Sequence, residues 1–332
     1  MKICLVGPGI MPIPPTGWGA VEILIWDYKI ILEKMGHEVQ IVNTSDLNDI
    51  LRQITLFNPD FVHIQYDDFV CLYPYIKYPC AVTTHFAYIE RPEMMGPYKQ
   101  RVFDIFSQIK PNILGLSESI NNVYNKVCNI PNDRLFLNPN GVNLKNFRYS
   151  STPKFPDKSI YLATIDHRKR QFLFQDIKSL WYAGNIRDDR FDESKNYLGE
   201  WNKDYLYKNL TEYGNLVLLS DGEAHPLVCM EAFASGLGVV VCEWGKANLD
   251  LNKKFISVIP ENKINDINFI EDMINENREY SILHREEILD YAKQFEWERV
   301  VEESYLPNIQ KIISNYEKLS LQYYSKVLVG IF

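Results

Sequence analysis

Short apolar runs alternate along the chain with longer stretches in which apolar residues recur every three or four positions. Residues 3–6 form an apolar run typical of a strand, and the spacing between residues 21 and 35 predicts an amphipathic helix that Gly36 ends. The alternation then predicts strands at residues 38–42, 61–65, 81–84 and 113–116, and a helix at residues 47–57. Strands separated by helices indicate a parallel sheet that is covered on both faces.

A second series of the same kind follows a segment rich in turn-forming residues. Residues 138–158 contain NPNGVN and SSTPKFPDK, which are typical of a domain linker. Beyond them the pattern predicts strands at residues 160–165, 180–182, 216–219, 238–242 and 255–259, a helix at 226–235, and helix from 266 nearly to the end. Residues 185–205 are polar and are predicted to form an irregular surface excursion, with a lid over the site as the alternative. We therefore predict two α/β units of similar size.

Composition and charge narrow the class of protein. The chain has 332 residues, 46% hydrophobic and 23% charged, which fits a globular protein of two domains. Its formal net charge of −8 provides no general basic field, so we expect no nucleic-acid partner. The sequence has no apolar stretch of the roughly 18–20 residues that span a membrane, no strongly basic amphipathic helix that would support a peripheral membrane contact, and no CxxC pair among its six cysteines. We expect a cytoplasmic protein with reduced cysteines.

The segment LSDGEAHPLVCMEAFASGLGVVV, residues 219–241, has the clearest chemical pattern. It begins at the end of a predicted strand, Pro226 suits the first position of a helix, and Gly236 ends that helix. The N–H groups near Leu227 and Val228 would then face the space beyond the strand, where open α/β sheets bind ligands. A helix N-terminus at this place favours an anion such as phosphate.

Two glutamates flank the start of this helix. Glu223 precedes it and Glu231 lies in its second turn, so both can reach one site. The same spacing of eight recurs at Glu271, Glu279 and Glu287, within a helical stretch of ordinary surface composition that is typical of solvated helix faces. Only the first pair has a strand before it and a helix that begins with proline and ends at a glycine before another strand, so we select that pair as functional.

The segment resembles the E-x7-E signature of the retaining GT-B glycosyltransferases of family 4 (glycosyl transferases group 1). Four further motifs resemble that family in order: GWGAVE at 17–22, a Gly-rich loop after the first strand; TTH at 83–85, a histidine ending the fourth strand; NPNGVNLKNF at 138–147, the linker; and FEWERVVEESY at 295–305, the C-terminal helix. The resemblance covers nearly the whole chain.

The resemblance implies an α/β GT-B fold of two Rossmann-like parallel-sheet domains that face each other across a cleft. Residues 1–150 would form the acceptor-side domain and residues 151–300 the nucleotide-sugar domain, and residues 301–332 would form a helix that returns to the first domain. The implied activity is transfer, with retention, from a UDP- or GDP-linked sugar to the hydroxyl of a saccharide, lipid-linked or other acceptor.

For the donor diphosphate, the family uses an arginine and a lysine after the first strand of its second domain. Lys169 falls on the family lysine, whereas Thr164 replaces the family arginine. Arg168 or Arg170 would supply the missing charge from another backbone position. The alternative is that these cations form only a basic surface at the start of a helix and bind no ligand.

The other donor contacts are also implied by the resemblance. We expect Glu231 to accept hydrogen bonds from the ribose hydroxyls and Glu223 to face the donor sugar. The backbone around His225, Leu227 and Val228 would hold the diphosphate and stabilise the departing negative charge.

In the first domain, His85 would contact the sugar or position the acceptor, and a core or capping histidine is the alternative. Gly17 and Gly19 would let a loop approach the phosphates closely, unless they are only turn glycines. The sequence has no DxD motif in a suitable context, so we expect no metal site and no cofactor. The sequence shows no evident base, and the resemblance therefore implies same-face attack, in which the leaving phosphate takes the acceptor proton, rather than a double displacement through Glu223.

Three alternatives remain open at this point. A nucleotide-sugar epimerase would share the nucleotide site and need no acceptor. A dinucleotide dehydrogenase is disfavoured because VGPGIMP at residues 6–12 has Pro12 where the third glycine belongs. An inactive nucleotide-binding module stays possible because of Thr164.

Overall fold

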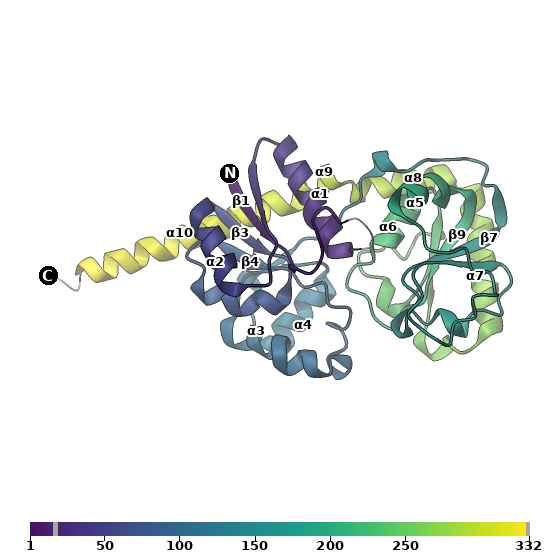
Figure 1. Ribbon diagram of the computed structural model, residues 1–332, viewed down its shortest axis with the longest axis horizontal. Coiled ribbons are helices and arrows are strands. Elements are labelled where there is room, and N and C mark those ends of the chain that lie inside the picture. The colour runs from purple at the N-terminus through teal and green to yellow at the C-terminus, as the bar shows by residue number, and fades with distance from the viewer. Residues whose placement is uncertain (16–18, 330–332) are drawn as a thin grey trace. The chain divides into compact units, whose positions relative to one another are not determined.

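The structure, a computed structural model, describes the backbone of residues 1–15 and 19–329 and the side chains through residue 318 (Figure 1). The chain forms two α/β units. Unit 1 contains residues 1–139 together with the segment from Trp297 onward, and unit 2 contains Asn140–Glu296. Each unit is built on one parallel sheet, which confirms the predicted α/β class.

Unit 1 has a six-stranded parallel sheet in the order β2-β1-β3-β4-β5-β6. Its strands are β1 (Lys2–Val6), β2 (Glu38–Val42), β3 (Phe61–Ile64), β4 (Cys80–Val82), β5 (Ile113–Gly115) and β6 (Leu135–Leu137). Its α-helices in the described part of the chain are α1 (Ala20–Lys34), α2 (Leu47–Phe57), α3 (Asp104–Ile109), α4 (Glu118–Cys128), α9 (Trp297–Val300) and α10 (Leu306–Val329). Strand β6 was not predicted, and of its three apolar residues only Phe136 is buried.

The C-terminal segment packs into unit 1 through aromatic side chains. Trp297 and Tyr305 are almost fully buried, and their rings lie 4.7 Å and 4.8 Å from the ring of Tyr28 on α1. The indole N–H of Trp297 donates to Asp27, and Asn138 donates to the Tyr28 hydroxyl. In place of the long helix expected from residue 266 onward, the chain forms several shorter elements. From Trp297 onward these elements contribute side chains to the core of unit 1.

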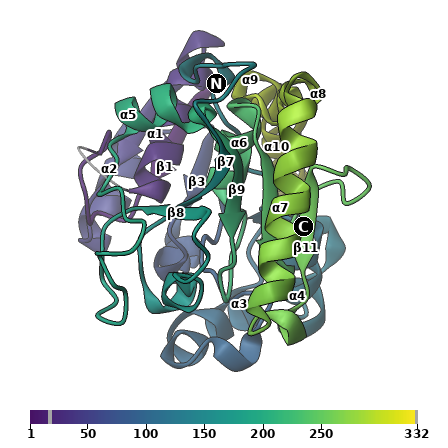
Figure 2. The same ribbon diagram turned by 90° about the vertical axis from the view of Figure 1, so that its right-hand side faces the viewer.

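Unit 2 has a five-stranded parallel sheet in the order β11-β10-β9-β7-β8. Its strands are β7 (Phe155–Leu162), β8 (Leu180–Ala183), β9 (Tyr213–Leu218), β10 (Gly238–Cys242) and β11 (Ile256–Ile259). Its α-helices are α5 (Lys203–Asn209), α6 (Leu227–Ala234), α7 (Ile267–Leu283) and α8 (Arg285–Ala292), as Figure 2 shows. Helices α6 and α7 both pack on β9 and β10.

The order of the strands creates a switch point in unit 2. Strand β7 has β8 on one side and β9 on the other, so the connections that leave β7 and β9 run in opposite directions along the sheet. Open α/β sheets bind their ligands beyond the carboxyl ends of the strands at such a point. Both of the predicted donor-site segments in this unit follow these two strands.

Two predicted boundaries differ from the structure. Strand β7 begins at Phe155, inside the predicted linker, because Pro156 and the charged residues after it conceal the start of the strand. The polar segment 185–205 returns to the sheet: Leu198 N–H donates to Tyr182 O (2.8 Å), and Gly184 N–H donates to Gly199 O (3.1 Å). The expected irregular excursion thus covers the free edge of β8 and leads into α5.

The units divide after Pro139 and after Glu296, whereas the resemblance implied divisions at 150 and 300. The first and last residues of unit 2 lie close together, since Val142 N–H donates to Phe295 O (2.8 Å). Ser150 also belongs to this unit, since its carbonyl accepts a hydrogen bond from Arg285.

The guanidinium of Arg285 joins three parts of unit 2. It is 2% exposed and donates five hydrogen bonds, to Ser150 O, Tyr213 O, Thr211 O, Thr211 Oγ1 and Ser235 O. Burial lowers its pKa to about 10, so the side chain stays charged at neutral pH. This one side chain ties the residues before β7, the start of β9 and the end of α6.

We predict that Arg285→Met lowers the free energy of unfolding by about 3–5 kcal/mol, because several buried acceptors lose their donor at once. Urea unfolding of the full chain measures this change. The matched control is Arg52→Met, which removes an exposed arginine paired with Asp49 on α2 and should stay within about 0.5 kcal/mol of the unsubstituted chain. Equal losses in the two variants would contradict the role given to Arg285.

Candidate functional site

Helix α6 follows β9 after a short loop and begins at Leu227, one residue later than predicted. Pro226 is the N-cap residue, with extended backbone angles, and Gly236 ends the helix at a φ of +76°. The first N–H groups of a helix have no acceptor within it, so those of Leu227 and Val228 point outward from its N-terminus. The helix is apolar and nearly all buried, which fixes this terminus at the carboxyl end of β9.

The loop after β7 presents two cations. Asp166 caps the short turn His167–Lys169 by accepting from the N–H of Lys169 (2.9 Å), and the Tyr161 hydroxyl donates to the Lys169 carbonyl. Asp221, in the loop after β9, donates its N–H to the carbonyl of Arg168 (2.7 Å). The two loops are thus joined through their backbones.

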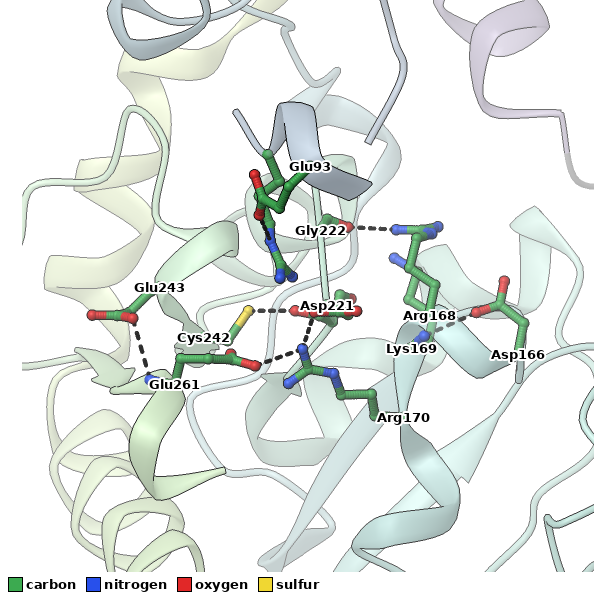
Figure 3. Close-up of polar contacts among 12 residues, drawn as sticks. Glu93, Asp166, Arg168, Lys169, Arg170, Asp221, Gly222, Cys242, Glu243 and Glu261 are labelled. Atoms are coloured by element: carbon green, nitrogen blue, oxygen red, sulfur yellow. Dashed lines mark hydrogen bonds and ion pairs between the residues drawn. The ribbon is translucent and has the colours of Figure 1, made fainter. Parts of the chain in front are cut away.

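Both of these cations form ion pairs with Glu223. Figure 3 shows Arg168 and Lys169 beside the loop at Asp221 and Gly222. The ammonium of Lys169 forms an ion pair with Glu223 Oε1, and Arg168 Nη1 lies 3.1 Å from the same oxygen and 2.7 Å from the carbonyl of Gly222. The Glu223 side chain is only 10% exposed. Burial alone would raise its pKa, but the attraction of Lys169 and Arg168 outweighs burial and lowers the pKa below its ordinary value.

Arg170 takes a different place from Arg168. Its guanidinium forms ion pairs with Asp221 and Glu261, and its backbone has a φ of +58° (Figure 3). The carboxylate of Glu243 accepts from the N–H of Glu261 (3.2 Å), so this group links the loops after four strands of the sheet. It is therefore Arg168, and not Arg170, that shares the Glu223 carboxylate with Lys169.

Glu231 lies in α6 and is also buried, with its side chain 9% exposed. Its carboxylate forms an ion pair with Lys203, the first residue of α5. Lys203 was missed in the sequence because it stands at the end of the segment that was predicted to be irregular. The capping pattern of Asn202, which accepts from Tyr205 N–H, is the signal that marks the start of α5.

The ring of His225 faces the start of unit 2. The N–H of Asn140 donates to His225 Nδ1 (3.0 Å), and the Asn140 side-chain amide donates to the His225 carbonyl (3.2 Å). Because Nδ1 accepts, the neutral ring carries its proton on Nε2. Thr164, which stands where the family arginine was expected, accepts through its carbonyl from Gln171 (3.0 Å).

The remaining predicted residues belong to unit 1. His85 lies three residues beyond the end of β4, not at its end, and burial lowers its pKa to about 4, so its ring is neutral at physiological pH. Gly19 caps α1, where a Cβ atom would lie 2.7 Å from Glu22 Oε2. Gly17 lies outside the described residues.

The segment that carries His85 is held by a buried carboxylate. Asp67 accepts from the hydroxyls of Thr84 and Tyr98, and the ring of Phe86 stacks on that of Tyr98 at 3.7 Å. His63, the second histidine of this sheet, has its Nε2 2.8 Å from Thr83 Oγ1, and burial lowers its pKa to about 3. His63 is thus a neutral core residue, whereas His85 lies on a fixed segment and is half-buried.

Two features that the described residues lack bear on other kinds of function. Among residues 1–15 and 19–329, no group of three or more His, Cys, Asp or Glu side chains is placed to hold a metal ion. In the same part of the chain, no helix combines the length and apolar character that crossing a membrane requires.

Solved structures resemble the chain over almost its whole length. Sucrose-phosphate synthase from Thermosynechococcus elongatus matches with a TM-score of 0.70 and 14% identity, covering 98% of this chain and 99% of the other. AviGT4, a glycosyltransferase involved in avilamycin A biosynthesis, matches with a TM-score of 0.68 and 16% identity, covering 95% and 98%. HepE from Anabaena, in complex with UDP-glucose, matches with a TM-score of 0.65 and 14% identity, covering 96% and 100%.

These likenesses show that the chain has the two-domain α/β fold called GT-B. No protein-family model matches the sequence, and no curated protein matches it.

The lowered pKa of Glu223 predicts how the stability of the chain depends on pH. A carboxylate whose pKa is lowered by folding stabilises the folded state above its ordinary pKa, and this contribution is lost as the pH falls through the lowered value. We therefore expect Glu223→Gln to be less stable than the unsubstituted chain at pH 7, and the difference to shrink below about pH 4.5.

Urea unfolding at a series of pH values measures this difference. Glu303→Gln is the control, because Glu303 forms an exposed pair with Arg299. A difference for Glu223→Gln that stays constant from pH 7 to strongly acidic pH would show that the two cations do not stabilise the ionised carboxylate.

Proposed function

We propose that this protein is a retaining glycosyltransferase of the GT-B family 4 class. It transfers a sugar from a nucleoside-diphosphate sugar to an acceptor hydroxyl and needs no metal ion. The observation that carries the proposal is the ion cluster of Glu223, Arg168 and Lys169, which lies at the carboxyl ends of β7 and β9 beside the N-terminal turn of α6.

The cluster has the charges that a diphosphate requires. Arg168 and Lys169 provide two cations from one loop, and the N–H groups of Leu227 and Val228 add the positive end of a helix. HepE, whose fold is similar, has been solved with UDP-glucose and with UDP and glucose, which supports a nucleotide sugar as the donor. Glu231 would accept hydrogen bonds from the ribose, since a carboxylate accepts from a diol.

Glu223 would face the donor sugar and bind its hydroxyls. Its carboxylate is already paired with two cations, which makes it a weak nucleophile, so a covalent sugar–enzyme intermediate is poorly supported. In same-face substitution the bond between the anomeric carbon and the phosphate oxygen breaks, and the acceptor oxygen bonds to that carbon on the same side. The acceptor proton passes to the leaving phosphate, which Arg168, Lys169 and the α6 terminus stabilise.

His85 would serve the acceptor side of this reaction. Because its imidazole is neutral, it can donate and accept hydrogen bonds with sugar hydroxyls, and it does not act as a cation. Gly17 and Gly19 would let the loop before α1 approach the substrates. The acceptor would be a saccharide, a lipid-linked sugar or another hydroxyl compound.

We predict that Lys169→Met and Arg168→Met each weaken the binding of the preferred nucleoside diphosphate by about 10- to 150-fold, the range expected for one charge-assisted hydrogen bond. The nucleoside without phosphates should bind both variants as it binds the unsubstituted chain. Calorimetry with UDP, GDP and ADP first identifies the base, and then the tightest of the three and its nucleoside are compared.

Lys195→Met is the matched control, because it removes an exposed lysine of the same unit that pairs with Asp176. If Lys169→Met and this control bind the diphosphate equally well, the diphosphate site has been assigned to the wrong residues.

We predict that transfer proceeds at an unchanged rate in the presence of EDTA, because protein cations and a helix terminus carry the charge stabilisation. Release of nucleoside diphosphate and formation of the glycosylated acceptor are followed with and without added Mg²⁺ or Mn²⁺. A loss of transfer in EDTA that divalent cations restore would contradict this claim.

The same assay separates the competing functions. A transferase yields a glycosylated product whose anomeric configuration matches that of the donor. A nucleotide-sugar epimerase instead yields an epimer without an acceptor. A binding module binds the nucleotide and converts no donor across a broad acceptor panel.

A further inference from the structure

Lys203 and Glu231 form an ion pair between two helices that are far apart in the sequence. Lys203 is the first residue of α5, and Glu231 lies in the second turn of α6 (Figure 2 labels both helices). The side chain of Glu231 is 9% exposed and that of Lys203 is 23% exposed. A pair with so little exposure differs from the ordinary surface pairs of this chain, which contribute little to stability.

Both partners stand on well-fixed backbone. Asn202 caps α5 by accepting from the N–H of Tyr205 (2.8 Å), and the buried ring of Trp201 meets the ring of Tyr205 edge-on at 5.0 Å. Helix α6 is almost wholly buried in the core of unit 2. The backbones that carry the ammonium and the carboxylate are therefore both held in place, which favours a single geometry of the ion pair.

Glu231 shares a face of α6 with the anion site. Residues three and four apart lie on the same side of a helix, so Glu231 stands below Leu227 and Val228, whose N–H groups form the positive end. An unpaired carboxylate at this place would repel a diphosphate. The ammonium of Lys203 neutralises it and engages Oε1, the oxygen on one side of the carboxylate.

We propose that Lys203 is a positioning residue that makes the site specific for a ribonucleotide. It holds Oε1 of Glu231 so that Oε2 accepts a hydrogen bond from a ribose hydroxyl of the bound nucleoside diphosphate. The inference rests on the proposed function, in which Glu231 faces the ribose, and it adds the residue that orients Glu231 and the selectivity that follows.

The test compares nucleoside diphosphates that differ in one hydroxyl. The probes are UDP, GDP and ADP with their 2′-deoxy and 3′-deoxy forms, and their dissociation constants are measured by calorimetry. For the unsubstituted chain we expect the ribose form to bind about 10- to 100-fold more tightly than at least one deoxy form, as for a hydrogen bond to a charged group.

In Lys203→Met this preference should fall to less than about threefold, because Glu231 is no longer held in one orientation. Lys203→Arg keeps the charge and should restore most of the preference, and Lys203→Gln provides a second uncharged variant should Lys203→Met fail to fold. Lys253→Met is the control, since it removes a lysine that pairs with the exposed Glu287 and should leave the preference unchanged.

The outcomes distinguish the inference from the proposed function. Failure of the unsubstituted chain to bind any nucleoside diphosphate would overturn both. Binding without a preference for ribose would overturn the inference alone. So would a preference that Glu231→Gln abolishes but Lys203→Met and Lys203→Gln leave intact, or variants of Lys203 that weaken the ribose and deoxy forms by the same factor.

Discussion

The buried carboxylate of Glu223 is the constraint on which the site of unit 2 depends. A carboxylate with one-tenth of its side chain exposed is costly to ionise unless opposite charges lie close to it. Lys169 and Arg168 supply those charges, and their own positions are set by the Asp166 cap, the Tyr161 hydroxyl and the Asp221 backbone. In the proposed function, the same cations that favour the ionised carboxylate also bind the donor diphosphate.

The topology of the sheet explains why these groups come together. The cations follow β7 and Glu223 follows β9, which are neighbours in the sheet although 54 residues separate Lys169 from Glu223. The connections leave these strands in opposite directions, so the loops between them are not filled by a crossing helix. Helix α6 then begins at this point with its N–H groups directed outward. Arg170 adds a further link between these loops by pairing with Asp221 and Glu261.

The sequence predicted those features that local patterns encode. The α/β class follows from alternating periodicities, and the placement of α6 follows from Pro226, Gly236 and the apolar run between them. Glu223 was selected by its place before a helix that begins with proline, and Lys169 was selected through a resemblance. The structure places both residues in one ion cluster. Their roles in binding and catalysis remain predictions.

Features that depend on distant partners were not predictable from the sequence. The pairing of Lys203 with Glu231 and the five hydrogen bonds of Arg285 join residues that no periodicity connects. The return of residues 196–199 to the edge of β8 uses backbone hydrogen bonds, which leave no pattern of apolar side chains. The choice between Arg168 and Arg170 also needed the structure, because each side chain is directed by the conformation of one short turn.

The most direct test of the central claim is a crystal structure of the chain with the nucleoside diphosphate that it binds most tightly. The account predicts phosphate oxygens within hydrogen-bond distance of Lys169 Nζ, of the Arg168 guanidinium and of the N–H groups at the start of α6. A diphosphate bound elsewhere in the molecule, with Glu223 still paired to both cations and no phosphate at α6, would contradict it.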